Sequence, residues 1–371
     1  MVQKQYHAYS CKADMTFEQA AEGLLAFLAG LRENGLTPVK VHVATRKNTD
    51  KGPKRLQAEF TRILKRDFVG EVPALTVVTQ PPADRSPLLA ETWSVREQEK
   101  DCCRFLTAGN LPHVVIGKDG ITELWTSGIV AGSPEEAFES LSRLLDGLHF
   151  SFDDIFRQWN YVGNILEEKS VNGKTIQNYQ HFNDIRAIYY QRKHDRSQFP
   201  AATGIGMDNE GVCIDLVAIR IDEASGCRNL PMKSPVQKDA YRYQEKVLVG
   251  ESDVLPVKNA PLFERGRRLK DSGHSVAMIS GTASIQGEET VDLDDIERQT
   301  RNTLRFIEEL TGNAPEETCR RARLYIKSGM DPEKAVAVFK AACPASCACT
   351  AVFADVCRDN LLVEIESDWT S

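Results

Sequence analysis

The sequence lacks any apolar run long enough to span a lipid bilayer. The longest apolar stretch near the start, residues 20–31, contains Glu22 and two glycines, and it falls short of the roughly 20 apolar residues that a membrane helix needs. Acidic residues at positions 14, 18 and 22 stand where a signal peptide would be free of acids. We therefore expect a cytoplasmic protein with no membrane segment.

An excess of positive charge is also missing. The chain has 46 Lys and Arg against 53 Asp and Glu, which gives a net charge of −7. Proteins that bind nucleic acids usually carry a basic face, so DNA is not expected as a partner and RNA is disfavoured. The helical segment at residues 55–65 is locally basic. With 371 residues, 42% of them hydrophobic, the chain can form two or three domains with proper cores.

Histidine is scarce, with seven in the chain and none after His274. Ten cysteines are present, and three of them form the cluster Cys343, Cys347 and Cys349. A zinc site needs a second pair of Cys or His at a defined distance, and the small residues around Cys349 are typical of a strand. We therefore expect free thiols and no metal site.

A repeated order of elements runs through the chain after the first 68 residues. The first copy has strands at 113–117 and 123–130, a helix from about 133, a strand at 156–165, a helix at 182–191, and strands at 199–206 and 212–219. The second copy has a strand at 275–285, a helix at 294–310, a strand at 322–326, a helix at 332–342 and a closing strand at 361–366. This order predicts an α+β fold, in which a mixed sheet is covered by two helices in each copy.

These patterns divide the chain into three parts. Residues 1–68 form an N-terminal α/β extension, residues 69–226 the first repeat and residues 227–371 the second repeat. Residues 226–273 are rich in Pro, Lys and Arg and are predicted to be a loop-like connector.

Motifs along the repeats resemble those of the Rid (YjgF-like) enamine/imine deaminases and, in their tandem order, the chorismatases. They are Tyr179-x2-Phe182-x3-Arg186, Thr203-Gly204-Ile205-Gly206, Pro261-x-Phe263-x-Arg265, Ser280-Gly281-Thr282-Ala283-Ser284 and Val363-Glu364-Ile365-Glu366. The resemblance covers roughly residues 70–370. It implies two tandem chorismate-mutase-like repeats, a trimeric assembly, no cofactor, and a pocket for a small carboxylate near the end of the closing strand.

The resemblance also implies cleavage of the enol-ether side chain of chorismate, or of a related small carboxylate, with release of pyruvate. Protonating an enol ether requires an acid whose pKa is raised toward neutrality. Glu364 is the candidate, because it shares one strand face with Glu366 and burial would raise its pKa. The alternative is that both glutamates lie on a solvated outer face.

Two arginines are candidates for holding the carboxylates of the substrate, since a guanidinium binds a carboxylate with two parallel hydrogen bonds. Arg265 lies in the Phe-x-Arg motif but also in a basic run that is typical of a surface. Arg186 lies on a helix stripe with Tyr179, where it can equally be a snorkelling residue at an aromatic core. Tyr179 or Tyr241 is expected to supply an aromatic wall.

Three further residues complete the predicted site. Gly281, followed by Thr282, allows close approach to the backbone, or else it marks a structural bulge. Cys357 resembles a pocket cysteine of hydroxybenzoate-forming chorismatases, and its thiol can be a nucleophile or a filler. The first repeat is interpreted as a degenerate copy, with Asp215 in place of the glutamate.

Two other functions remain open at this stage. One is an imine deaminase, in which Arg358 or Lys327 would replace the arginine that the deaminases use. The other is a non-catalytic sensor of small ligands, or a translation-associated regulatory protein, for which the basic helix at residues 55–65 could supply a local face.

Overall fold

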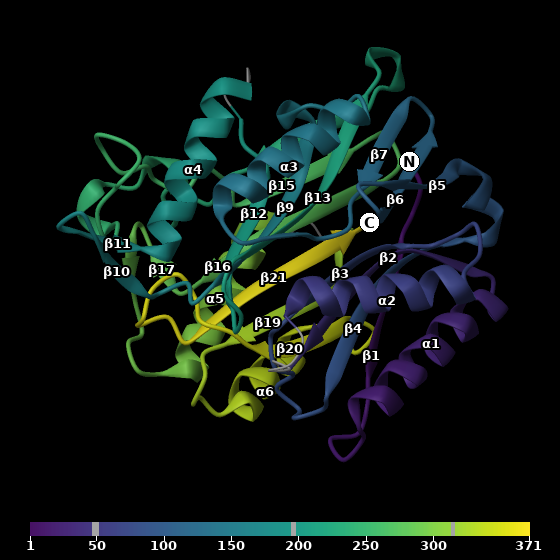
Figure 1. Cartoon of the computed structure of the whole chain (residues 1–371), viewed down its shortest axis with the longest axis horizontal. Coiled ribbons are helices and arrows are strands. Elements are labelled where there is room, and N and C mark those ends of the chain that lie inside the picture. Colours follow the sequence, from purple (N-terminus) through teal and green to yellow (C-terminus); the bar gives the residue numbers. More distant parts are fainter. Residues whose placement is uncertain (47–51, 194–197, 313–315) are drawn as a thin grey trace.

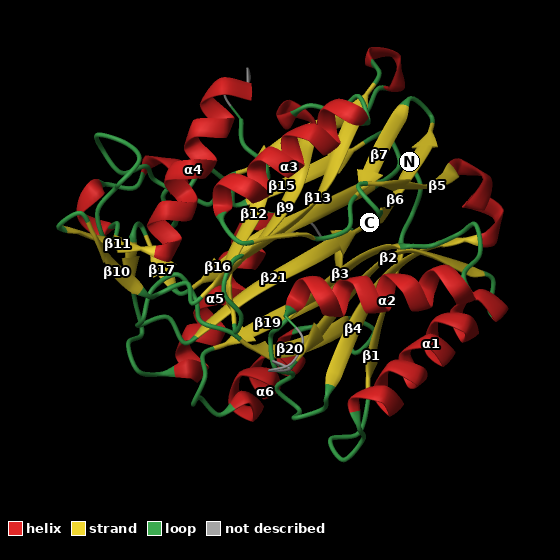
Figure 2. Ribbon diagram, in the orientation of Figure 1, coloured by secondary structure: helices red, strands yellow, loops and turns green. Residues whose placement is uncertain are grey.

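The computed structural model describes residues 1–46, 52–193, 198–312 and 316–371. Strands fill the middle of the molecule and helices lie toward its outside (Figures 1 and 2). None of the helices in the described ranges is long and apolar enough to cross a membrane.

The first module is a four-stranded sheet with two helices. Its elements are β1 (Gln5–Ser10), α1 (Phe17–Glu33), β2 (Leu36–Thr45), α2 (Pro53–Asp67), β3 (Ala74–Val78) and β4 (Leu88–Arg96). The strand order is β1-β4-β2-β3, in which β2 pairs in parallel with β3 and antiparallel with β4. Because β3 and β4 belong to this sheet, the module extends beyond the boundary predicted at residue 68.

The second module has the same order of elements as the first, preceded by a β-hairpin. Its main elements are β5 (Cys103–Ala108), β6 (Leu111–Lys118), β7 (Ile121–Trp125), β8 (Ile129–Ala131), α3 (Pro134–Gly147), β9 (Ile155–Gly163), α4 (Asn178–Lys193), β12 (Ala201–Met207) and β13 (Val212–Ile221). A small hairpin of β10 (Glu168–Val171) and β11 (Lys174–Gln177) precedes α4. The strand order is β12-β9-β13-β7-β6-β5, and β8 also pairs with β13.

The third module repeats this order. Its elements are β14 (Arg228–Met232), β15 (Gly266–Lys270), β16 (Ser275–Ala283), α5 (Ile296–Thr311), β19 (Thr318–Ile326), α6 (Pro332–Ala342), β20 (Ala348–Phe353) and β21 (Val363–Thr370), with a short hairpin of β17 (Ile285–Gln286) and β18 (Glu289–Thr290). The strand order is β14-β15-β16-β21-β19-β20. The predicted pair of sheet-plus-two-helix repeats is therefore confirmed, whereas the predicted connector is wrong in part, because it contains β14 and β15.

The first module has the same topology as the other two without the leading hairpin. In each module the last-but-one strand pairs in parallel with the strand between the two helices, and the closing strand lies antiparallel to that same strand. The N-terminal part is thus a third, shorter copy of the unit. Sequence patterns did not indicate this, since the hairpin and the Ser-Gly motif are missing from it.

Polar caps set where the helices begin. Thr16 accepts a hydrogen bond from the backbone N–H of Gln19, whose side chain bonds back to Thr16, so α1 starts with a capping box. At α3 and α6 a single side chain caps the helix, because Ser133 accepts from the backbone N–H of Glu136 and Asp331 from that of Glu333, and a proline follows each cap at the first helical position.

Apolar side chains form three outer cores and one central core. Each outer core lies between one sheet and its own helices. The central core joins residues from all three sheets, among them Trp93 of the first module, Trp125 and Trp159 of the second, and Tyr325 of the third. The inner faces of the three sheets therefore pack against one another around a common centre.

Equivalent positions in the three modules carry the same kinds of polar side chain toward this centre. Strand register identifies them, because each parallel edge strand aligns residue by residue with the strand beside it and each closing strand aligns with the same strand. In the order first, second and third module, the threonines are Thr76, Thr203 and Thr350, the cations are Lys40, Arg157 and Arg321, and the acids are Glu91, Asp215 and Glu366.

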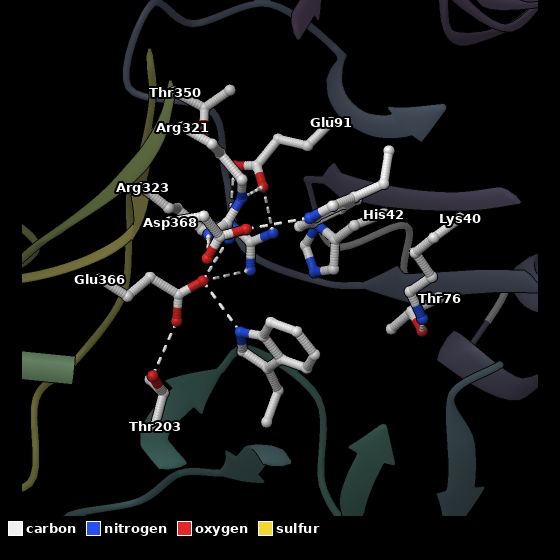
Figure 3. A network of polar contacts seen from close by, with 12 residues as sticks. Lys40, His42, Thr76, Glu91, Thr203, Arg321, Arg323, Thr350, Glu366 and Asp368 are labelled. Atoms are coloured by element: carbon white, nitrogen blue, oxygen red, sulfur yellow. Dashed lines mark hydrogen bonds and ion pairs between the residues drawn. The ribbon is translucent and has the colours of Figure 1, made fainter. Parts of the chain in front are cut away.

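The threonine and the cation of each module donate to the acid of the next module. Figure 3 shows part of this network, including the contact of Thr203 with Glu366. Thr350 of the third module donates to Glu91 of the first, which closes the ring. The donor–acceptor distances are 2.9 Å for Lys40 Nζ and 2.6 Å for Thr76 Oγ1 to Asp215, 2.7 Å for both Arg157 Nη2 and Thr203 Oγ1 to Glu366, and 2.6 Å for Arg321 Nε to Glu91. The chain thus forms a closed head-to-tail ring of three modules by itself.

Candidate active site

A cavity of about 60 Å³ lies where the second module meets the third. Helix α4 and strand β12 form one side, β16 and β21 form the other, and the segment between β14 and β15 covers it. Tyr179, Tyr243, Arg265, Gly281, Cys357 and Glu364 are among the residues that line it. Five of the residues predicted from the sequence are therefore brought to one place.

Glu364 lies on a strand that is covered on both sides. Strand β21 pairs with β16 at one edge and with β19 at the other, and the Glu364 side chain is 5% exposed. Glu366 is fully buried two residues farther along the same face. The alternative of a solvated outer face is therefore excluded for both glutamates.

The two glutamates have opposite pKa shifts. Burial, together with repulsion from Glu366, raises the pKa of Glu364 to about 8. Burial also opposes the ionisation of Glu366, but the guanidinium groups of Arg157 and Arg321 outweigh it and lower its pKa to about 2. At neutral pH the site thus holds one protonated carboxyl beside one carboxylate, a pairing that suits acid catalysis.

Hydrogen bonds fix the Glu366 carboxylate in place. Trp159 donates from Nε1 to Oε1 at 2.9 Å, and Arg321 donates to the same oxygen. Arg157 and Thr203 donate to Oε2, and Figure 3 shows the contact of Thr203. Thr203 Oγ1 also accepts the backbone N–H of Gly281 at 3.0 Å. The polar ring at the centre of the molecule is thereby connected to the wall of the cavity.

Gly281 makes room for the acid. A Cβ atom at this position would lie 1.9 Å from Glu364 Oε1 and 3.1 Å from Thr203 Cγ2. Any side chain here would displace the carboxyl, because real Cβ atoms do not come so close to another heavy atom. The close approach expected at this glycine is thus made by Glu364.

Arg265 lines the cavity and has one polar atom without a partner among the described residues. Its Nη2 donates to the Lys238 carbonyl at 2.8 Å and to the Tyr243 hydroxyl at 2.6 Å. The side chain is 3% exposed, and its Nε has no hydrogen-bond partner within the described part of the chain. A buried N–H without a partner is costly, so this group is available to a ligand carboxylate.

A second arginine lines the same cavity. The Tyr243 ring has Arg265 and Arg358 at 5.6 Å and 5.5 Å from its centroid, and Arg358 Nη1 donates to the Glu288 carbonyl at 2.8 Å. Lys327, the other cation considered for a deaminase, pairs instead with Asp359 at 2.6 Å. Two cations around one aromatic ring match a ligand with two carboxylates.

Tyr179 and Cys357 stay neutral at physiological pH. Burial, with Cys357 and Glu364 nearby, raises the pKa of Tyr179 above its usual value. Burial and the Glu364 carboxyl raise the pKa of Cys357 to about 12. The Cys357 group is therefore a thiol, which is a poor nucleophile, and it shapes the wall beside the acid.

Three predicted residues do not line the cavity. Arg186 is buried over the Tyr190 ring, 5.1 Å from its centroid, so it belongs to an aromatic core as the alternative expected but does not reach solvent as a snorkelling residue would. Tyr241 donates to Asp239 at 2.9 Å and packs on Phe199. The Thr282 hydroxyl donates to the Ser280 carbonyl at 2.9 Å, because alternation along β16 turns it away from Gly281.

The counterpart of Glu364 in the second module is Cys213. Register pairs Asp215 with Trp159 and Glu366 with the equivalent Arg323, so Asp215 matches Glu366. The expected exchange of Glu364 for Asp215 is therefore wrong by two positions. The sequence could not settle this, because β21 carries acids at three alternate positions whereas β13 carries only Asp215, which can be aligned with more than one of them.

Tyr243, Gln180 and Asn183 were not predicted as parts of the site. Asn183 follows Tyr179 by four residues, so the helix stripe could have indicated it, whereas Gln180 is the direct neighbour of Tyr179 and has no such signal. Tyr243 lies in an irregular segment more than twenty residues before Arg265, and no local pattern connects the two.

Comparison with known proteins supports the resemblance to the chorismatases that the sequence motifs indicated. Residues 90–218 match the family model described as "Chorismatase FkbO/Hyg5-like, N-terminal". A 3-hydroxybenzoate synthase from Streptomyces hygroscopicus is 29% identical over 62% of this chain and 67% of its own length. A chorismatase from Streptomyces rapamycinicus is 24% identical over 67% of this chain and 72% of its own length.

The fold as a whole has a solved relative. A chorismatase crystal structure superposes with a TM-score of 0.68, covering 99% of this chain and 98% of its own at 18% identity. The resemblance inferred from the motifs is thus confirmed in sequence for most of the chain, and in fold for nearly all of it.

Proposed function

We propose that this chain, which resembles the chorismatases in sequence and in fold, cleaves the enol-ether side chain of chorismate and releases pyruvate. One observation carries the proposal: a buried glutamic acid, Glu364, with a pKa of about 8, lies in a cavity with Arg265 and Arg358. A proton donor beside two carboxylate-binding groups is what a dicarboxylate enol ether requires.

The proton of Glu364 is transferred to the methylene carbon of the enol ether. The electron pair of the carbon–carbon double bond forms the new C–H bond, and the adjacent ether carbon becomes an oxocarbenium centre. Water adds to that carbon, its proton returns to Glu364, and the hemiketal collapses to pyruvate and a ring alcohol. Glu366 remains ionised throughout, since its pKa is about 2, and its charge keeps Glu364 protonated until the substrate takes the proton.

Two cations position the substrate. Arg265, whose Nε has no partner among the described residues, binds one carboxylate, and Arg358, which also contacts the Tyr243 ring, binds the second. Tyr179 and Phe263 contribute aromatic surface to the cavity. Together they place the enol-ether methylene against Glu364, which is the orientation that lowers the barrier.

We expect 3-hydroxybenzoate as the ring product. The relative from Streptomyces hygroscopicus bears the name of such a synthase, and the Cys357 thiol lies in the cavity beside Glu364. Formation of this product loses the water that hydrolysis adds, so chorismate is converted to 3-hydroxybenzoate and pyruvate with no other reactant.

The experiment is incubation of the protein with chorismate, with pyruvate measured enzymatically and ring products separated by chromatography. We expect pyruvate and 3-hydroxybenzoate from the wild type, and a loss of at least about a hundredfold in the Glu364→Gln variant, because general acid catalysis contributes about that much. Wild-type protein that releases no pyruvate above background would contradict the proposal.

The active unit is proposed to be a single chain in the cytoplasm. The resemblance implied a homotrimer, but the three modules already form a closed ring inside one chain. All ten cysteines are free thiols, which favours a reducing compartment.

A further inference from the structure

A second and larger cavity lies where the first module meets the second. Its volume is about 840 Å³. Helix α2 forms one side, and the hairpin β5–β6, strand β8 and helix α3 form the other. None of the residues proposed to act on chorismate lines this second cavity.

This cavity occupies the place that corresponds to the candidate active site. Gly128 follows a serine as Gly281 does, and a Cβ atom on Gly128 would lie 2.8 Å from Cys213 Sγ and 3.0 Å from Thr76 Cγ2. The same two contacts at Gly281 involve Glu364 and Thr203. The two cavities are therefore equivalent by module position, with a cysteine where the active site has its acid.

Because Cys213 stands where the active site has Glu364, this cavity lacks the proton donor. Cys213 is fully buried, and burial together with Asp215 raises the pKa of its thiol well above the usual value. His113, the titratable ring in this cavity, has its pKa lowered to about 4 by burial and is neutral at physiological pH. Neither group can serve as a general acid there, so a bound molecule would not be converted by the same route.

Four cations surround the cavity. Lys54, Arg62 and Lys65 come from α2 and Arg143 comes from α3, and among the described residues no aspartate or glutamate lines the cavity. Lys54 and Arg62 form no ion pair with any residue in the described ranges. Arg143 is only loosely paired, at 3.6 Å from Glu139 on its own helix. The rim therefore attracts anions.

The interior is apolar with one polar group that lacks a partner. Leu111, Ile129, Leu144 and Leu148 supply apolar wall. The Thr61 side chain, 5% exposed, lines the cavity, and its hydroxyl has no hydrogen-bond partner in the part of the chain that the structure describes. A buried hydroxyl without a partner costs free energy, which a ligand oxygen would recover.

We propose that this cavity binds a small organic acid, a six-membered ring carrying a carboxylate, and does not convert it. The ring would lie on the apolar wall, and the carboxylate would face Arg62 and Arg143. Nucleic acid fits less well, because no Phe, Tyr or Trp lines the cavity for base stacking and the chain has a net charge of −7. In this proposal the basic segment at residues 55–65, which is part of α2, helps to bind a small molecule.

The test is calorimetric titration of the full chain with 3-hydroxybenzoate at low ionic strength. The double variant Arg62→Gln with Arg143→Gln should lose one bound equivalent, or weaken that site by about tenfold or more, since charge-assisted hydrogen bonds contribute this much. The matched control is Arg66→Gln, which removes the same charge from α2 at a residue that pairs with Asp67 and lies outside the cavity. Pyruvate release by the double variant should equal that of the wild type.

Several results would overturn the inference. These are an unchanged stoichiometry and affinity in the double variant, an equal loss in Arg66→Gln, inorganic phosphate binding as tightly as 3-hydroxybenzoate, or a short RNA binding in its place. Pyruvate release is measured separately, so a chain that releases none but loses a bound equivalent in the double variant would contradict only the proposed function.

Discussion

Glu364 and Glu366 lie two residues apart on one strand, with pKa values of about 8 and about 2. The difference arises from what surrounds each carboxyl. Glu366 is bonded by arginines of two modules, while Glu364 is buried against Gly281 with the Glu366 charge nearby. One group therefore keeps its charge and the other keeps its proton.

This arrangement predicts how activity depends on pH. Glu364 is the acid and its pKa is raised, so it is protonated below about pH 8 and loses its proton as the pH rises through that value. The value of kcat/KM for pyruvate release should accordingly be level at neutral pH and fall above about pH 8. Glu366 adds no change in this range, since its pKa is about 2.

Steady-state rates from pH 6 to 10 would measure this, with circular dichroism at each pH to show that the fold persists. A rate that rises through pH 8 would mean that the ionised form of Glu364 is required, which contradicts its role as an acid.

The sequence could predict Glu364, Gly281 and Arg265 because each lies in a short motif. Tyr243 could not be predicted in this way, since it reaches the cavity from an irregular segment through a contact with Arg265. Arg186 shows the reverse case, because its helix stripe is as typical of an aromatic core as of a binding site, and only packing decides between them.

At the scale of elements, the site depends on how closely β16 approaches β21. The two strands pair with a register irregularity between Ile279 and Thr282, and Gly281 lies inside it. The carboxyl of Glu364 fits there only because residue 281 has no side chain.

The variant Gly281→Ala should therefore keep its fold and lose activity by about a hundredfold, because a shift of about 1 Å in a catalytic group has effects of that size. Gly117→Ala on β6 is the matched control, since no atom lies within 4 Å of its added Cβ, and it should be fully active. Pyruvate release measures both. Equal activities in the two variants would show that the close approach does not position the acid.

Most elements of the second and third modules were predictable from periodicity and turn residues. The hairpin strands β14 and β15 were not, because their basic and proline-containing sequences are typical of loops. Strand β15 is buried instead, and Arg267 and Arg268 find partners in Asn229 and Glu317. Burial of charged strands depends on partners far away in the sequence, which no local pattern reveals.

At the scale of the whole molecule, three modules close into a ring through buried ion pairs. Lys40 and Asp215, each 2% exposed, join the first module to the second, and the equivalent pairs join the others. The sequence predicted two copies and not three. The first module lacks the motifs of the site, and its likeness to the others is visible only in strand order.

The variant Lys40→Met should lower the free energy of unfolding by about 3–5 kcal/mol, because it leaves the Asp215 charge buried without its cation. Adding Asp215→Asn should restore part of the loss. Urea unfolding measures both, and the midpoint should not depend on protein concentration, since the ring closes within one chain. A Lys40→Met variant as stable as the wild type, or a midpoint that rises with concentration, would contradict this view of the assembly.

The central claim is that Glu364 passes an exchangeable proton to the enol-ether carbon. The most direct test is to run the reaction in D2O, trap the pyruvate at once by reduction to lactate, and count its deuterium by mass spectrometry. The account predicts one deuterium in the methyl group of pyruvate formed by the wild type, and pyruvate formation at least about a hundredfold slower with Glu364→Gln. Pyruvate formed by the wild type without deuterium in its methyl group would contradict the account.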